Sequence, residues 1–193
     1  MRYSVEHKQE TRARILDAAG QLFRSEGYGG SGIDGLTRTA GVTNGAFYGH
    51  FKSKSEAFRA AVRAGLDELR LGIAELKAKK GKSWLGAFIA FYLGPKRTCD
   101  LRQGCALPSL SADVMRADDE TRGAYETALR LVIDEVAAGL PGASLAARRD
   151  EAIALLALLS GGVTLARAVA DEALAERIAQ AVRRHALAMT AQA

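Results

Sequence analysis

Apolar residues recur at helical spacing through nearly all of this 193-residue chain, and this pattern constrains the fold most. Helix-favouring alanine, leucine, arginine and glutamate are abundant, and no β-branched run alternates with polar residues as in a strand. The pattern therefore predicts an all-α fold of about nine helices.

The predicted helices are separated by glycine, proline and capping residues. Their ranges are 8–27, 33–41, a short helix after Thr43, a long helix from Ser53 or Ser55 to Lys80, about ten residues from Ser83, then 108–116, 118–138, 145–169 and 171–189. Residues 94–98 are predicted to interrupt the pattern because they contain Gly94 and Pro95. We predict two domains, an N-terminal three-helix domain over 1–54 and a helical bundle over 55–193.

The composition is that of an ordinary globular protein, with 48% hydrophobic and 25% charged residues. Two cysteines are too few for a disulfide framework, and no apolar run follows the N-terminus as in a signal peptide. The longest apolar stretch, 152–166, is shorter than the roughly 20 residues that a membrane-spanning helix needs. We expect a cytoplasmic protein with no membrane partner and with reduced thiols.

Positive charge is concentrated near the N-terminus. Residues 1–60 contain nine Lys or Arg and six Asp or Glu, a difference of +3 within a total net charge of +5. This excess in under a third of the chain favours an anionic partner for the N-terminal domain.

Two short predicted helices meet at Ala40-Gly41-Val42-Thr43. Gly41 can adopt the left-handed backbone of a tight turn, Val42 can pack beneath it, and Thr43 can cap the second helix. This arrangement is typical of a helix-turn-helix, in which the second helix enters the DNA major groove by its N-terminus.

The candidate DNA-binding residues follow this turn: Thr43, Asn44, Gly45, Ala46, Phe47, Tyr48, His50, Lys52 and Lys54. Asn44 can bond a base edge or a phosphate, Phe47 can touch a thymine methyl, and small residues allow close approach to the duplex. Tyr48, Lys52 and Lys54 suit phosphate. Alternatively, Phe47 and Phe51 are core residues, the lysines are solvated, and His50 is structural.

These residues carry a family resemblance. Gly27-Tyr28, the AGV turn, and Gly45, Phe47, Tyr48, His50, Phe51, Lys52 and Lys54, preceded by the helix with Arg14-Ile15-Leu16, resemble the DNA-binding domain of TetR/AcrR-family transcriptional regulators. The resemblance covers about the first sixty residues. It implies a homodimeric repressor whose variable C-terminal domain binds a ligand and forms the dimer interface.

The predicted helix over 145–169 is apolar nearly all round between Ala152 and Ala166. Such a helix must be buried on most sides, either within one subunit or at a subunit interface. Gly161-Gly162 would allow another helix to approach closely. We predict a homodimer through the last two helices, about 145–189, with Leu174, Ile178, Ala181, Val182 and His185 on the final helix.

A ligand pocket is predicted among the middle helices, because aromatic residues and methionine suit an apolar small molecule. Its candidate lining is Trp84, Phe88, Phe91, Tyr92, Cys105, Leu107, Met115 and Tyr125, each of which can instead be ordinary core. Cys105 lies near a predicted helix start and close in sequence to cations, so it is a candidate oxidant or electrophile sensor with Cys99 as a resolving partner. The alternative is a buried, inert thiol.

The predicted function is a DNA-binding transcriptional regulator, most simply a repressor released from a palindromic operator by a small-molecule or thiol-reactive inducer. An enzyme is not expected, because the three histidines are scattered and no phosphate-binding loop or metal-ligand spacing occurs. No cofactor and no metal are predicted. The alternative function is a ligand-binding or interaction bundle with little DNA binding.

Overall fold

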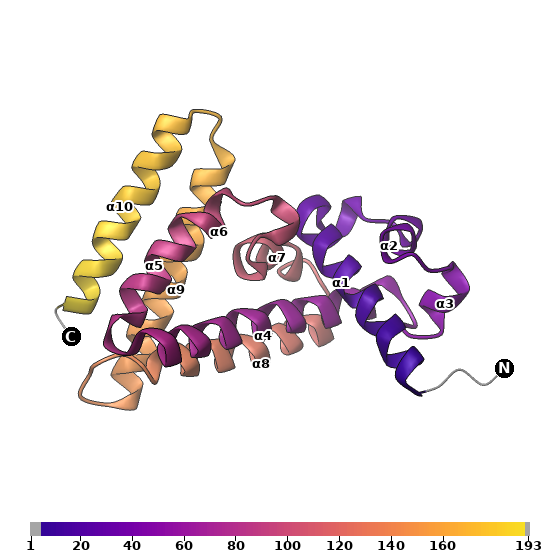
Figure 1. The fold of residues 1–193 in the computed structure, drawn as a ribbon, viewed down its shortest axis with the longest axis horizontal. Helices are drawn as coiled ribbons and strands as arrows, with labels where there is room; N and C mark the ends of the chain where they lie inside the picture. Colours follow the sequence, from indigo (N-terminus) through magenta and orange to yellow (C-terminus); the bar gives the residue numbers. More distant parts are fainter. Residues whose placement is uncertain (1–4, 192–193) are drawn as a thin grey trace. The chain divides into compact units, whose positions relative to one another are not determined.

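The computed structural model describes residues 5–191, and within that range it contains α-helices and short 3₁₀-helices but no strand. The predicted all-α fold is confirmed. The helices are α1 (Val5–Gly30), α2 (Ile33–Ala40), α3 (Asn44–Tyr48), α4 (Lys54–Lys80), η1 (Gly81–Ser83), α5 (Trp84–Leu93), α6 (Pro95–Thr98), η2 (Leu101–Gln103), α7 (Ala106–Val114), α8 (Asp119–Ala137), α9 (Leu145–Ala168) and α10 (Glu172–Ala191) (Figure 1).

The chain forms two compact units. The first unit extends to Gly65 and includes Leu101–Tyr125, and the second contains Leu66–Asp100 and the chain from Glu126 onward. The predicted functional division at residues 54 and 55 remains a prediction, but the first packing unit is larger than residues 1–54. It recruits η2, α7 and the start of α8 from the middle of the sequence.

The first unit has one apolar core built from α1, α2, α3, the start of α4, and α7. Phe23 and Phe58 meet edge to face with ring centroids 5.1 Å apart, and Tyr28 lies 5.0 Å from Phe58. Ala106, Leu110 and Val114 of α7 belong to the same buried cluster. Helix α7 is therefore part of the support on which the N-terminal helices pack.

Helix α1 bends at Gly27, the residue at which the sequence predicted its end. Gly27 has φ 71° and ψ 172°, a backbone conformation that favours glycine, and helical structure resumes after it to Gly30. The backbone N–H of Tyr28 then donates to Asp113 Oδ2 of α7 over 2.8 Å. The bend is thus fixed by a side chain more than eighty residues away in the sequence.

In the second unit, α10 runs back along α9, with α5 beside them (Figure 1). Gly162 allows this packing, because a Cβ there would lie 2.8 Å from Val182 Cγ2, whereas a Cβ on Gly161 would meet nothing within 4 Å. Close approach at the glycine pair is confirmed for Gly162, but the helix that approaches it belongs to the same chain. Val182, predicted to face a partner subunit, packs within its own chain.

Helix α9 buries one stripe and exposes another. Its buried residues recur at three- and four-residue spacing: Ala152, Leu155, Leu156, Leu159, Val163 and Ala166. By length and composition alone the whole helix is apolar enough to cross a membrane, contrary to our expectation from residues 152–166, because the helix extends beyond that stretch. The spacing of its buried residues is that of a helix packed in a bundle.

Candidate nucleic-acid interface

The turn between α2 and α3 has the geometry predicted from its sequence. Gly41 adopts φ 63° and ψ 40°, in the left-handed region, and its N–H donates to Arg38 O. The N–H of Val42 donates to Thr37 O over 3.0 Å. Thr43 Oγ1 accepts from the N–H of Ala46 over 3.1 Å, which caps α3 as expected.

Helix α3 divides its side chains between the core and the surface. Phe47 is fully buried and lies 5.8 Å from the ring centroid of Phe51, so the prediction that it touches a thymine methyl is wrong. Its ring instead anchors α3 to the core, the alternative that the sequence left open. Tyr48 is 56% exposed and is available to a ligand outside the core.

The exposed residues of α3 begin at the capped end. Thr43, Asn44 and Gly45 are exposed and Ala46 is half-buried. The Asn44 side chain has partners on α2: its Nδ2 donates to Asp34 Oδ1 and its Oδ1 accepts from Thr37 Oγ1, each over 2.9 Å. These partners could not be predicted from the sequence, because no rule of spacing connects α2 to the first residue of α3.

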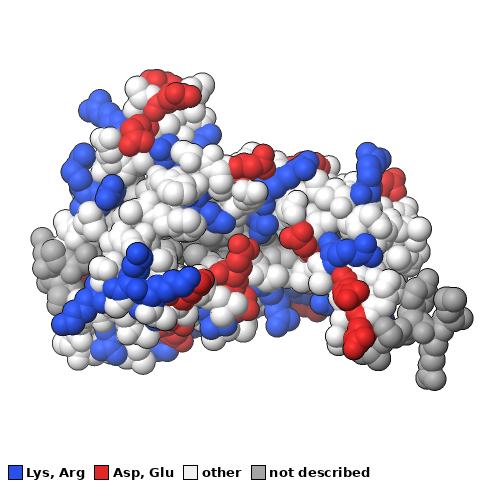
Figure 2. All heavy atoms as spheres, in the orientation of Figure 1, with Lys and Arg blue, Asp and Glu red and all other residues white. Residues whose placement is uncertain are grey.

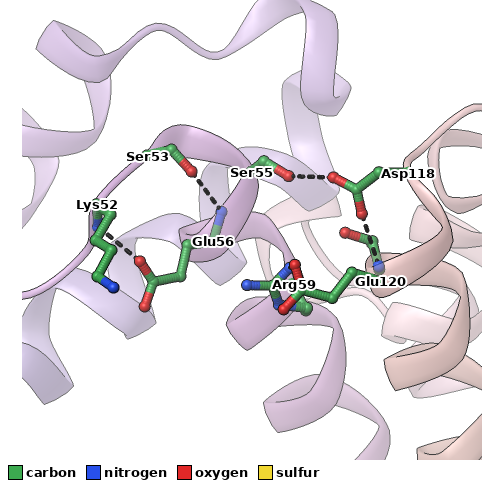
Figure 3. Close-up of polar contacts among 8 residues, drawn as sticks. Lys52, Ser53, Ser55, Glu56, Arg59, Asp118 and Glu120 are labelled. Carbon is green, nitrogen blue, oxygen red and sulfur yellow. Dashed lines mark hydrogen bonds and ion pairs between the residues drawn. The ribbon is translucent and has the colours of Figure 1, made fainter.

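Helix α4 begins with a variant of the capping box, in which the glutamate accepts from the residue before the capping serine. Ser53 Oγ accepts from the N–H of Glu56 over 3.1 Å, and Glu56 Oε2 accepts from the N–H of Lys52 over 2.6 Å (Figure 3). Of the two serines predicted to cap this helix, Ser53 does so. The box fixes the backbone that carries Lys52 and Lys54.

The two lysines differ in their surroundings. The Lys52 side chain is exposed. Lys54 Nζ lies 4.2 Å from the ring centroid of Tyr28, a cation–π contact that holds the ammonium beside α1. Tyr28 therefore limits the positions that Lys54 can occupy at the edge of the α3 surface.

Ser55 is not the cap but ties α4 to the start of α8. Its hydroxyl donates to Asp118 Oδ2 over 2.8 Å, and the N–H of Thr121 donates to Asp118 Oδ1 over 2.7 Å (Figure 3). The proximity of Thr121 and the hydrogen bond from Ser55 lower the pKa of Asp118 to about 2. An ion pair of 2.5 Å between Arg59 and Glu120 lies beside these bonds.

A group of positive residues adjoins the end of α3. Burial lowers the pKa of half-buried His50 below its usual 6.5, and the charges of Lys8 and Arg12 lower it further. Arg12 also lies over the Phe51 ring, 5.0 Å from its centroid. Sequence reasoning missed Lys8 and Arg12, although their four-residue spacing places them on one face of α1.

Charges of both signs are interspersed over the face of the molecule that Figure 2 shows, with no single large patch of lysine and arginine there. The N-terminal excess of positive charge includes lysines and arginines near α3. Those at the α3 surface are Lys8, Arg12, Lys52 and Lys54.

The predicted pocket residues fall into two groups, one in each unit. In the second unit Trp84, Phe88 and Tyr92 are buried along α5, with ring centroids 6.4 Å and 5.4 Å apart in succession. The first unit buries Cys105 and Leu107 and half-buries Tyr125, whose hydroxyl lies 2.9 Å from Ser111 Oγ. Phe91 and Met115 are 48% and 72% exposed, so neither is an ordinary core residue, and their place in a ligand pocket stays a prediction.

The two cysteines also belong to different units. Cys105 is buried and occupies the N-cap position of α7, which agrees with its predicted place at a helix start. Cys99 is half-buried, and its Sγ lies 3.4 Å from Nη2 of Arg167, which also donates to the carbonyl oxygens of Lys96 and Cys99.

The fold and the α2–turn–α3 geometry together define a helix-turn-helix protein of the DNA-binding class. Residues 15–61 match the family model described as "Bacterial regulatory proteins, tetR family". The chain is 40% identical over 76 residues to the transcriptional regulator AcrR of Shigella flexneri, covering 39% of this chain and 34% of AcrR. The alignments with the first curated relatives thus span a third to a half of each relative's length.

Longer matches extend beyond the N-terminal domain. The chain is 28% identical over 136 residues to the transcriptional repressor NemR of Escherichia coli, covering 69% of this chain and 67% of NemR. The structure of reduced E. coli NemR has a TM-score of 0.77 at 23% identity over 91% of this chain and 94% of NemR. The structure of Bacillus subtilis FadR in complex with stearoyl-CoA has a TM-score of 0.63 at 16% identity, over 88% of this chain and 96% of FadR.

Residues 15–61 therefore form a DNA-binding domain of the TetR family, and the chain as a whole has the fold of TetR-family transcriptional regulators. This agrees with the resemblance to TetR/AcrR-family regulators that the sequence indicates. The members of this family are regulators and not enzymes, which agrees with the functional class predicted from the sequence.

Proposed function

We propose that this protein is a homodimeric transcriptional repressor that binds a palindromic operator and is released by an inducer. The observation that carries the proposal is the capped α3, which exposes Asn44, Gly45 and Tyr48 beside a set of positive side chains. Exposed polar groups at the N-terminus of such a helix suit base edges, and the flanking cations suit phosphates.

The DNA-binding step is tested by selecting duplexes from a random pool with the full chain. The affinity for the most enriched duplex is then measured at several salt concentrations. Lys54→Ala should weaken binding to every duplex and reduce the salt slope by about one counterion. Lys82→Ala is the matched control, because Lys82 is exposed in η1 of the second unit and should leave the slope unchanged. An unchanged slope in Lys54→Ala would remove Lys54 from the phosphate contacts.

The same selection decides between the proposal and its alternative. A protein that enriches no duplex even at low salt would be a ligand-binding or interaction bundle, and the repressor proposal would be refuted. A protein that enriches an inverted repeat supports both the operator and a two-fold symmetric dimer, since half-site spacing reflects the distance between two recognition helices.

The dimer is proposed to form through the exposed stripe of α9 and the adjoining face of α10. Ile153 and Leu165 of α9 are 49% and 60% exposed, and Leu174 of α10 is 43% exposed. Gly161 lies on the same stripe with open space around it, which would let a partner helix come close. A second copy of the chain would cover these apolar side chains.

Sedimentation equilibrium tests this interface. Leu165→Glu should convert a dimer to monomer, because it would bury a charge against a symmetry-related apolar surface. Leu71→Glu on α4 is the control, since Leu71 is 52% exposed and lies outside the proposed interface. A Leu165→Glu protein that remains dimeric would refute this placement of the interface.

The inducer is proposed to be a small molecule bound in the helical bundle or a thiol-reactive compound. FadR holds stearoyl-CoA in its structure, which supports the first class by analogy of fold. For the second class, N-ethylmaleimide is added to the protein–DNA complex, and release is compared in the wild type, Cys99→Ser and Cys105→Ser. Release that persists in Cys105→Ser would show that Cys105 is not the sensor.

We also propose a cytoplasmic location, because the proposed partner is DNA.

A further inference from the structure

The strongest unassigned feature of the α3 surface is the hydrogen-bonded set Asp34–Asn44–Thr37. Asn44 is the first residue of the recognition helix, and Asp34 and Thr37 lie on α2. Asn44 Nδ2 donates to Asp34 Oδ1 and Asn44 Oδ1 accepts from Thr37 Oγ1, both over 2.9 Å. Thr37 is buried, whereas Asp34 and Asn44 are exposed.

The chemistry of these groups fixes which way the amide faces. An ionised carboxylate can only accept hydrogen bonds, so the nitrogen of Asn44, not its oxygen, must face Asp34. The Thr37 hydroxyl then donates to the amide oxygen. A side chain that is otherwise free to rotate is thereby held in one orientation by two bonds from one neighbouring helix.

The two bonds leave half of the amide unused. A primary amide has two N–H donors and two oxygen lone pairs, and each bond takes one of them. One donor and one acceptor remain on Asn44. A donor and an acceptor on one amide are what asparagine uses to bind N7 and N6 of adenine together in the major groove.

We propose that Asp34 and Thr37 are positioning residues that orient Asn44 to read an adenine in each half of the operator. This inference rests on the proposed function and adds to it a specificity device that lies partly outside α3. Asp34 also places a negative charge beside the proposed DNA surface. It opposes phosphate contacts made without regard to sequence, so it favours specific over non-specific binding.

The experiment uses the full chain and the operator selected by the wild type. Affinities are measured for a panel in which each base pair of a half-site is replaced symmetrically. Asn44→Ala should lose about ten- to hundredfold discrimination at one A·T position and keep it elsewhere. Asp34→Ala and Thr37→Val should weaken discrimination at that same position without any change at the others.

Conservative variants separate orientation from a merely structural tie between α2 and α3. Asp34→Asn keeps an oxygen acceptor and Thr37→Ser keeps the hydroxyl, so both should retain the A·T preference. Asp34→Ala and Asp34→Asn should both bind unrelated duplexes more tightly than the wild type, with a steeper salt dependence. Melting temperatures of all variants identify any loss that comes from folding alone.

Two outcomes would overturn the assignment. In the first, Asn44→Ala leaves the base preference unchanged. In the second, Asp34→Ala and Thr37→Val weaken binding equally on every operator of the panel. A wild-type protein that selects no duplex refutes the proposed function itself, a result distinct from a selected operator whose recognition ignores these residues.

Discussion

Helix α4 contains two glycines, Gly65 and Gly72, that are seven residues apart and therefore lie two turns apart on the same side of the helix. A Cβ on Gly65 would lie 2.4 Å from the Cβ of Ala106 at the start of α7, whereas a Cβ on Gly72 would meet nothing within 4 Å. Replacing each with alanine therefore compares one chemical change in a packed and in an open environment.

The expected energies follow from these distances. Alanine within a helix is favoured over glycine by about 0.5–1 kcal/mol, and both variants gain this term. In Gly65→Ala the new methyl would lie 1.0 Å closer to Ala106 Cβ than the 3.4 Å at which ordinary contact begins. Ala106 Cβ is attached directly to the backbone and cannot rotate away. Overpacking of this kind costs about 1–3 kcal/mol, and taking the upper half gives a net loss of about 1–2.5 kcal/mol.

Thermal unfolding followed by circular dichroism measures the difference, at one protein concentration because dimerisation would shift the midpoint. Gly72→Ala should raise Tm by a few degrees and Gly65→Ala should lower it, at about 2–4 °C per kcal/mol for a chain of this size. Gly65→Ala combined with Ala106→Gly should recover part of the loss. If Gly65→Ala stabilises the protein as much as Gly72→Ala does, the close contact between α4 and α7 does not exist.

Three further predictions concern the α3 surface and its supports. His50 has a lowered pKa in the free protein, and a DNA phosphate beside it would raise that pKa, so DNA affinity should increase as the pH falls from about 8 to about 5.5. His50→Gln should remove this pH dependence. If the wild type and His50→Gln have the same pH profile of DNA affinity, His50 is excluded from the interface. The pKa of Asp118 is lowered to about 2, so its contribution to stability is present above its unfolded pKa and is lost as the pH falls through about 2. The difference in free energy of unfolding between the wild type and Asp118→Asn, measured by denaturant titration, should therefore shrink below about pH 4. A difference that stays constant with pH would contradict this. Thr43→Ala removes the cap on the N–H of Ala46 and should cost about 1 kcal/mol in denaturant unfolding, while Thr43→Ser should cost little; equal losses would exclude the cap.

Much of the fold could be predicted because it depends on local rules. Helix ends at Ala40, Lys80 and Leu93 agree with the predicted boundaries within a residue or two, since they are set by glycines, prolines and capping side chains nearby. The left-handed Gly41 and the Thr43 cap follow from residues within one turn of each other. For the same reason the family resemblance, carried by this segment, was correct.

The division of side chains between core and partner could not be predicted in this way. The sequence shows that Phe47 is apolar but does not show whether its ring contacts the core or a DNA base. Only the packing of α3 against Phe51 decides this. In the same way, Gly161 and Gly162 are neighbours in sequence, yet one faces open space and the other meets Val182. A difference of one residue turns a helix position by about 100°, so contact depends on where the next helix lies.

Contacts between segments that are far apart in the sequence were the least predictable part of the structure. Nothing in the order of residues connects Asp113 with Tyr28 or shows that 101–125 packs with the N-terminal helices. The sequence by itself determined the long helices, the turn and the class of site, because each is stabilised by bonds within a few residues, whereas the short helix α6 formed where Gly94 and Pro95 predicted an interruption. The tertiary structure alone decided which polar groups meet, including Asp34 and Asn44, because those pairs form only when separate helices are packed together.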